Sequence, residues 1–309
     1  MFGAGVAEVQ ASVLASLPAE LNRVRASAWS QEVLGTTSIG SFLEGPCPMP
    51  DGTLLVSDLA HGRILRLSPS GVFDVVFEYH GEPNGLALGA DGVLFIADYR
   101  RGLLTLDLES LELRTVVDRY RLEPFRGLSD LAFGPDGSLY FSDQGQSDLR
   151  FPTGRLFRWD PASGLSLLVD SIPSPNGVAV SPDGSLLYLA VTRANCVYRV
   201  PLWDDGRIGK VGVHFHSAGG SGGPDGLAVG RDGSLVVAQY GAGRAWVLDA
   251  LGIVTASVTS RAGLGITNVA FLPDSAGRLL LTEAGSGSIL QAELGIPGAP
   301  LFAGPRHGS

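Results

Sequence analysis

One polar residue recurs at a fixed distance before each Asp-Gly pair of the chain. Seven residues ahead of the pairs at 51, 91, 136, 183 and 232 stand Glu44, Asn84, Ser129, Asn176 and Asp225. A sixth, degenerate copy places Asn268 ahead of residues 273–277. Polar side chains at one offset in every repeat converge if the repeats surround an axis. Carboxylate and amide oxygens gathered in this way are the ligands that hard divalent cations prefer.

Three of these residues are the strongest predicted metal ligands. Glu44, Asn176 and Asp225 supply two carboxylates and an amide oxygen, and such a set favours Ca²⁺, Mg²⁺ or Mn²⁺ over Zn²⁺ or Cu²⁺. A glycine follows each of them and lets the backbone approach the axis closely. A single Asn-Gly or Asp-Gly pair is more often a turn than a ligand. Three oxygen donors at equal offsets favour the metal site.

The elements that must position these side chains repeat with the same period. Successive Asp-Gly pairs are 40, 45, 47 and 49 residues apart, and the degenerate Asp274 follows 42 residues later. Each repeat has a short apolar strand, the Asp-Gly turn and a second apolar strand, as at residues 85–88 and 93–97. Asp-Gly supplies the positive φ of a tight hairpin. We therefore predict an all-β, six-bladed β-propeller over residues 39–296, with one blade per repeat.

The flanks of the repeats carry weaker signals. Residues 1–38 form a predicted N-terminal extension, with a short helix at 18–24 and a strand that closes the ring. Residues 297–309 are rich in Pro and Gly and are expected to form a C-terminal tail. No linker divides the chain into two domains.

Composition and net charge argue against a nucleic-acid-binding or membrane-spanning protein. The 309 residues include 43 glycines and carry a net charge of −9, which gives no electrostatic reason to bind nucleic acid or an anionic membrane. The N-terminus does not resemble a signal peptide, and no apolar run approaches the ~20 residues of a membrane span. Cys47 and Cys196 do not suggest a disulfide framework. We expect a cytoplasmic protein with a small-molecule substrate. The sequence does not determine its oligomeric state.

Polar residues after the second strands are weaker candidates. Arg100 and Arg101 follow the second strand of the second repeat, where contact with a substrate competes with simple solvation. Gln144 and Gln146 follow the equivalent strand of the third repeat and are expected to line the entrance to the site.

Other titratable residues have structural interpretations. His214 and His216 alternate with Phe215, and one outward face of a strand is favoured over a catalytic dyad. Cys47 is interpreted as buried filler, not as a nucleophile. Four acids end the second strands and are interpreted as inter-blade hydrogen-bonding or capping groups, not as catalytic groups: Asp58, Asp98, Asp143 and Glu283.

Four short strings resemble a known family. Residues 44–46, 129–131, 175–179 and 224–228 are similar, in this order, to the motifs of the senescence marker protein/gluconolactonase (regucalcin-like) family. The resemblance covers about residues 40–295. It implies a six-bladed propeller that opens a sugar-acid lactone or a related cyclic ester at one divalent cation in the central channel. Ca²⁺ is the first choice, with Mg²⁺, Mn²⁺, Zn²⁺ and Fe²⁺ as alternatives. By this resemblance Glu44, Asn176 and Asp225 hold the metal.

The resemblance also assigns substrate contacts. The family has Asn-Asp where this chain has Ser129-Asp130, so the shorter Ser129 is expected to reach the substrate directly or through water. Asp225 is the first choice for the base that activates water, and Asp130 is the second. Asp130 matches the family pattern and is also a predicted substrate contact. The remaining predicted substrate contacts are Asn84, Asn268 and Arg100.

Two other functions remain open on the same scaffold. One is a strictosidine-synthase-like enzyme, which would use a catalytic Glu and an apolar site. The other is a non-enzymatic propeller that binds a cation or a partner. Fold alone does not decide between them. The three oxygen ligands favour the lactone hydrolase.

Overall fold

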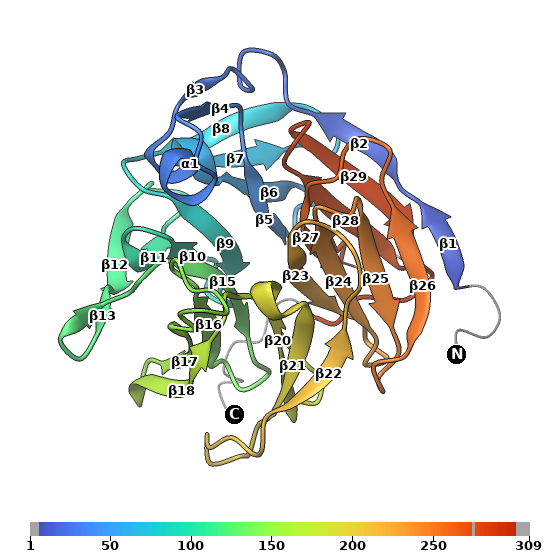
Figure 1. The fold of residues 1–309 in the computed structure, drawn as a ribbon. Coiled ribbons are helices and arrows are strands. Elements are labelled where there is room, and N and C mark those ends of the chain that lie inside the picture. The colour runs from blue at the N-terminus through green and yellow to red at the C-terminus, as the bar shows by residue number, and fades with distance from the viewer. Residues whose placement is uncertain (1–5, 274–275, 301–309) are drawn as a thin grey trace.

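Short apolar strands joined by Asp-Gly turns form radial sheets around a central axis. The computed structural model describes residues 6–273 and 276–300, and in this part of the chain six blades surround the axis (Figure 1). Each blade has four antiparallel strands, to which blade five adds a fifth, parallel strand at its outer edge, and the first strand from the repeat is innermost. The predicted all-β, six-bladed propeller is confirmed.

The first three blades take their strands in chain order. Blade one is β5 (Leu43–Pro48), β6 (Leu54–Asp58), β7 (Arg63–Leu67) and β8 (Phe73–Glu78). Blade two is β9 (Pro83–Leu88), β10 (Leu94–Asp98), β11 (Gly102–Leu106) and β12 (Leu113–Val117). Blade three is β15 (Leu128–Phe133), β16 (Leu139–Asp143), β17 (Gly154–Asp160) and β18 (Gly164–Ile172). A small ribbon of β13 (Arg119–Tyr120) and β14 (Glu123–Pro124) connects blades two and three.

The last three blades follow the same order, except that the sixth lacks a fourth strand of its own. Blade four is β19 (Pro175–Val180), β20 (Leu186–Val191), β21 (Cys196–Pro201) and β22 (Gly212–His216). Blade five is β23 (Gly223–Val229), β24 (Leu235–Tyr240), β25 (Arg244–Leu248) and β26 (Val254–Thr259). Blade six has β27 (Ile266–Phe271), β28 (Arg278–Glu283) and β29 (Ser288–Glu293).

The N-terminal segment completes the ring. Strand β2 (Ser12–Ser16) pairs antiparallel with β29 as the outer strand of blade six, and β1 (Ala7–Gln10) pairs parallel with β26 of blade five. Ala15 and Leu17 belong to the apolar cluster that packs blade six against blade one. The first and last blades are therefore joined by strand pairing as well as by side-chain packing.

The helix expected at residues 18–24 is not formed. Only one turn exists there, with the N–H groups of Leu21 and Asn22 both donating to the carbonyl of Pro18. The Asn22 carboxamide accepts from the Ser41 N–H at 2.9 Å and donates to the Ser286 carbonyl at 3.3 Å. These tertiary bonds override the local helical preference.

The helix of this extension lies further along the chain. It is α1 (Ala28–Val33), whose Ser27 side chain caps the N–H of Ser30. A short ribbon of β3 (Arg25–Ala26) and β4 (Ser38–Ile39) flanks it. The helix lies over one face of the ring (Figure 1). No helix among residues 6–273 and 276–300 is long and apolar enough to cross a bilayer.

The Asp-Gly turns adopt the conformation that their sequence predicts. Gly52 and Gly137 have φ of 83° and 82°, values that favour glycine. The Asp51 carboxylate accepts from the Thr53 N–H at 2.9 Å, and Asp136 accepts from Ser138 in the same way at 3.0 Å.

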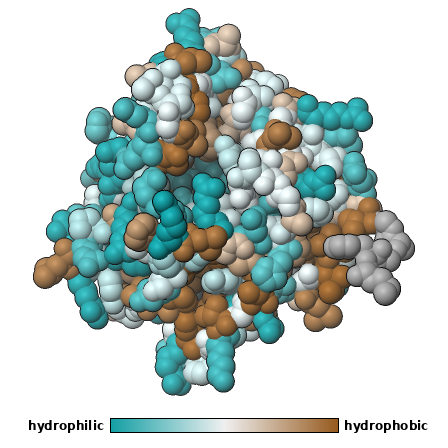
Figure 2. All heavy atoms as spheres, in the orientation of Figure 1, coloured by the Kyte–Doolittle hydropathy of each residue, from teal (hydrophilic) through white to brown (hydrophobic). Residues whose placement is uncertain are grey.

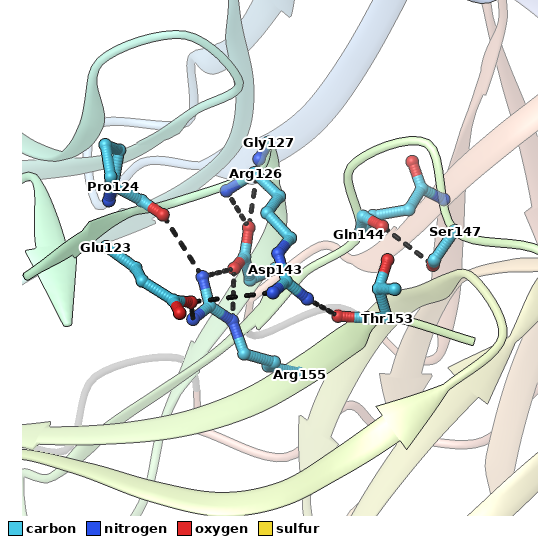
Figure 3. A network of polar contacts seen from close by, with 9 residues as sticks. All are labelled: Glu123, Pro124, Arg126, Gly127, Asp143, Gln144, Ser147, Thr153 and Arg155. Carbon is cyan, nitrogen blue, oxygen red and sulfur yellow. Dashed lines mark hydrogen bonds and ion pairs between the residues drawn. The ribbon is translucent and has the colours of Figure 1, made fainter. Parts of the chain in front are cut away.

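The acids at the ends of the second strands hold the loops that enter the innermost strands. Asp143 accepts from the N–H groups of Arg126 and Gly127 at 2.7 and 2.9 Å (Figure 3). Its other oxygen accepts from the buried Arg155 guanidinium at 2.8 Å. Asp58, Asp98 and Glu283 accept equivalent backbone N–H groups within their own blades. The interpretation of these acids as capping groups is confirmed.

Candidate metal centre

A bulge interrupts each innermost strand at the recurrent polar residue. The pairing register shifts between Glu44 and Cys47, between Pro175 and Val178, and between Pro224 and Leu227. Each shift leaves two residues of the innermost strand unpaired against the second strand. A bulge of this kind redirects side chains. The local irregularity is therefore what turns the polar residues towards the axis.

Glycines after these residues allow neighbouring innermost strands to approach closely. A Cβ on Gly45 would lie 2.3 Å from the Asn84 carbonyl oxygen of the next blade, and one on Gly177 would lie 2.2 Å from that of Asp225. A Cβ on Gly226 would lie 1.9 Å from the Asn268 Oδ1 atom. Any side chain at these positions would push the blades apart. The predicted close approach of the ligand loops is therefore present.

Gly226→Ala tests this close approach. Because the new Cβ would collide with the Asn268 amide, we expect a loss of about 1–3 kcal/mol in the free energy of unfolding, measured by denaturant titration. Gly212→Ala is the matched control, since its Cβ would meet only the flexible Arg199 side chain at 3.4 Å. Equal stability of the two variants would contradict the proposed packing constraint.

The structure brings five of the recurrent residues to one cavity of about 600 Å³: Glu44, Asn84, Ser129, Asn176 and Asp225. The Ser129 hydroxyl donates to Asn176 Oδ1 at 2.9 Å, and Asn84 Nδ2 donates to Ser129 Oγ at 3.4 Å. Residues from five repeats and more than a hundred positions apart are thus within reach of one small ligand.

The sixth copy is displaced by one residue from its expected position. Ile266 pairs with Glu283 just as Leu128 pairs with Asp143, so Thr267 corresponds to Ser129. Asn268 corresponds to Asp130, one position further on. This repeat has no Asp-Gly pair, so the position seven residues before the turn could not be identified from the sequence. Asn268 is therefore not the structural equivalent of the other five residues.

Asp130 and Asn268 lie together on the other side of the polar ring. Both line the central channel below the cavity, and neither lines the cavity itself. Asn268 Nδ2 donates to Glu44 Oε2 at 3.1 Å, and its side chain also hydrogen-bonds the Asp130 carboxyl. Asp130 Oδ2 accepts from the Val178 N–H at 3.2 Å. In this arrangement Asn268 links Glu44 to Asp130 and supports the floor of the site.

Burial and mutual repulsion raise the pKa values of the three carboxyl groups. Burial, followed by the charge of Asp130, raises the pKa of Glu44 to about 8. Burial raises the pKa of Asp130 to about 6. Burial and then the charge of Glu44 raise the pKa of Asp225 well above its usual range. Without a cation, the protein therefore binds protons at these carboxyl groups near neutral pH.

A buried oxygen without a partner marks the centre of the site. Asp225 Oδ1 has no hydrogen-bond partner among the described residues, while the Asp225 carboxyl interacts with the Asn176 side chain. Such an atom normally has a partner in the functional protein. Within residues 6–273 and 276–300, no three His, Cys, Asp or Glu side chains are grouped as a metal would require. The amide oxygen of Asn176 would therefore have to complete a set begun by Glu44 and Asp225, as the sequence predicts, and the residues fit a hard cation.

Arg100 does not reach this cavity. Its guanidinium pairs with Glu82 at 2.7 Å, and its side chain is 44% exposed on the outer part of the face. The arginines that line the cavity are Arg150 and Arg193, and neither was predicted from the sequence. Arg193 follows the second strand of blade four as Arg100 follows that of blade two, so the repeat pattern did contain a signal. Gln144 and Gln146 line the cavity as expected.

The histidines and cysteines lie elsewhere. His214 is on β22, the outer strand of blade four, where its ring packs on Tyr188 with centroids 4.8 Å apart. Both cysteines are unpaired and buried, and burial raises the pKa of Cys47 to about 12. None of these groups lines the cavity. The structural interpretations of His214, His216 and Cys47 therefore hold.

Hydroxyl groups of neighbouring blades fix the backbone beside the site. Ser57 donates to the Asn84 carbonyl and Ser142 to the Asn176 carbonyl, both at 2.6 Å. Thr192 donates to the Pro224 carbonyl at 2.7 Å. Each of these bonds crosses from one blade to the next. The polar residues are therefore held relative to one another, and not merely within their own strands.

The fold and the ring of polar residues define a family. Residues 42–285 match the model of the SMP-30/gluconolactonase/LRE-like region, and the chain belongs to this family.

Named relatives agree with this assignment. The chain is 27% identical over 251 residues to the lactonase drp35 of Staphylococcus saprophyticus, covering 77% of this chain and 76% of the relative. A regucalcin from Agrobacterium tumefaciens, described as a calcium-binding protein, superposes with a TM-score of 0.76 at 23% identity, covering 96% of this chain and 98% of that one. A gluconolactonase from Xanthomonas campestris superposes with a TM-score of 0.73 at 24% identity, covering 93% and 99%. The two solved structures establish the shared fold.

Proposed function

We propose that this protein is a lactonase that uses one divalent cation, with Ca²⁺ as the first choice. The observation that carries the proposal is the buried, unpartnered Oδ1 atom of Asp225 in a cavity that Glu44 and Asn176 also line. Membership of the family and the similarity to lactonase drp35 support the enzyme class. The similarity to a calcium-binding regucalcin supports the choice of metal.

Glu44, Asn176 and Asp225 would hold the cation. When bound, it would act as a Lewis acid that polarises the lactone carbonyl and stabilises the negative charge that develops on its oxygen. The negative charge of these carboxylates would be balanced by the metal, which would keep them ionised at neutral pH.

The chain's own residues would move the protons. Water adds to the carbonyl carbon as Asp225 accepts its proton, and the ring C–O bond then breaks. The proton passes to the departing alkoxide oxygen, so that the product is the open hydroxy acid. Asn84 and Ser129 line the same cavity and would orient the lactone through their amide and hydroxyl groups.

The structure favours Asp225 over Asp130 as the base. Asp225 lines the cavity, whereas Asp130 lies on the channel side and accepts from a backbone N–H group. We propose that Asp130 and Asn268 support Glu44 from below and do not touch the substrate. Arg100 is likewise assigned no substrate contact.

A lactone panel tests the proposed function. Purified protein would be loaded with CaCl₂, and acid release from five- and six-membered lactones would be followed by pH-stat titration with and without chelator. Chelator-sensitive hydrolysis that returns on adding Ca²⁺ is expected. Cation binding without hydrolysis of any lactone would instead identify a binding protein and reject the proposal.

The cysteines bear on the proposed location. Cys47 and Cys196 are both unpaired in the described structure, and buried thiols persist most readily in a reducing compartment. We propose a cytoplasmic protein on this ground.

A further inference from the structure

The cavity above the polar ring has two unlike sides. One side carries the apolar wall, which we define as Trp29, Val33, Leu34, Phe42, Leu59 and Tyr240. The opposite side carries amide, hydroxyl and charged groups from blades three and four, including Gln144, Ser147, Arg150 and Arg193. The face that holds the cavity is shown in Figure 2, where hydrophobic and hydrophilic atoms both border its middle.

The apolar wall is a built feature with its own packing. Trp29 of α1 packs on Phe42 with ring centroids 4.6 Å apart, and Phe42 lies 6.2 Å from Tyr240. Ser30, fully buried in α1, donates to the Thr36 carbonyl at 2.7 Å and fastens the helix to the segment that follows it. The rings therefore form a rigid backing for the side chains that meet the cavity.

The accessible part of the wall consists of two aliphatic residues and one tyrosine. Leu34, which follows α1, is 40% exposed, and Val33 and Tyr240 are half-buried, while Trp29, Phe42 and Leu59 are buried behind them. Tyr240 belongs to both regions, because it lines the same cavity as Glu44 and Asp225 and packs near Phe42. The apolar wall thus begins beside the reacting carboxylates.

This distribution is unfavourable for a substrate that carries hydroxyl groups on every carbon. A hydroxyl held against Val33 or Leu34 would lose water without gaining a partner, at a cost of roughly tenfold in affinity. On the opposite side, Gln144 already donates to Ser174 and Arg150 already pairs with Asp148. An alkyl group on the wall would instead contribute about fourfold in affinity per buried methylene.

We propose that the substrate is an amphiphilic lactone whose alkyl or aryl substituent packs on the apolar wall while its ring lies over Glu44, Asn176 and Asp225. This proposal rests on the lactonase function proposed above and narrows its substrate class. It distinguishes the protein from an enzyme built for polyhydroxylated sugar-acid lactones.

A series of six-membered lactones tests the proposal. Calcium-loaded protein would be assayed with δ-valerolactone, δ-hexalactone, δ-octalactone and glucono-δ-lactone, which share the ring and differ in the substituent. We expect kcat/KM to rise about fourfold per methylene along the alkyl series, and δ-octalactone to exceed glucono-δ-lactone. Preference for glucono-δ-lactone, or no dependence on chain length, would overturn the proposal while leaving the lactonase function intact.

Substitution of the wall links this preference to its residues. Leu34→Ser should reduce the ratio of kcat/KM for δ-octalactone over δ-valerolactone by about fourfold or more. Leu251→Ser, at an 83% exposed position in the turn between β25 and β26, should leave the ratio unchanged. An unchanged ratio in Leu34→Ser would count against the wall as the binding surface.

A binding measurement separates failure of the proposal from failure of the lactonase function. If no lactone is hydrolysed, titration calorimetry with 5-hydroxyoctanoate and gluconate still tests the wall. Tighter binding of 5-hydroxyoctanoate that is lost in Leu34→Ser would support it. Binding of neither acid, or tighter binding of gluconate, would overturn it.

Discussion

Replacement of Asp225 by Asn should lower kcat/KM for lactones by about 10³-fold or more, with the protein still folded. The amide is nearly isosteric with the carboxyl group and can remain beside Asn176. It cannot accept a proton, and it removes one of the two carboxylates of the proposed metal site. Stopped-flow or pH-stat assays at saturating Ca²⁺ would measure the loss.

The stability of this variant provides a second readout. In the metal-free protein, burial and the charge of Glu44 disfavour ionised Asp225, so the neutral amide should leave the thermal midpoint unchanged or raise it. Asp205→Asn is the control, because Asp205 lies on an exposed turn where it pairs with Arg207. Wild-type turnover in a folded Asp225→Asn protein would rule out Asp225 as the base.

Cation binding should release protons near neutral pH. Glu44, whose pKa is raised to about 8, is largely protonated at pH 7 in the metal-free protein, and the pKa of Asp225 is raised as well. A cation requires the ionised forms, so its apparent affinity should increase as pH rises from 6 to 8. Calorimetry of Ca²⁺ binding in buffers of different ionisation enthalpy should report release of about one proton or more at pH 7.

The stability of the metal-free protein should have the matching pH dependence. A carboxyl group whose pKa is raised by folding stabilises the fold below its unfolded pKa, and this contribution is lost as pH rises through the folded pKa. The thermal midpoint should therefore fall between about pH 4.5 and pH 8, and added Ca²⁺ should offset the fall. Glu44→Gln should reduce both the proton release and this slope, whereas Glu112→Gln, at an exposed position just before β12, should change neither. Proton-neutral binding would place the cation elsewhere.

The architecture and most of the polar ring were predictable from the repeat. The Asp-Gly turn specifies a hairpin through the positive φ of its glycine, as at Gly52 and Gly137, and five such hairpins with one degenerate copy imply six blades. The family resemblance is confirmed by the match over residues 42–285. Because equal offsets place residues at equal heights on equivalent strands, Glu44, Asn176 and Asp225 do line one cavity. Their role as metal ligands stays a prediction.

Errors arose where a local pattern was ambiguous. In blade six the turn is degenerate, and Asn268 was therefore predicted to be the equivalent of Asp225. The strand register shows that Thr267 is the equivalent residue. At residues 18–24 the local helical preference yielded to the tertiary hydrogen bonds of Asn22. Arg100 and Arg193 occupy similar places in their repeats. Arg100 was predicted to contact the substrate, but its ion pair with Glu82 holds it away from the cavity.

The sequence by itself determined the number of blades, the strands and the residue types that face the axis, because these depend on period and on local backbone preference. Tertiary structure decided which side of the polar ring each side chain reaches. Asp130 and Asn268 occupy the strand position that is glycine in the other four repeats. At this position, contacts with the adjacent blade direct the side chain into the central channel. Tertiary structure also placed α1 over the cavity and so gave one side its apolar wall. Such contacts join residues far apart in the chain, and no local pattern encodes them.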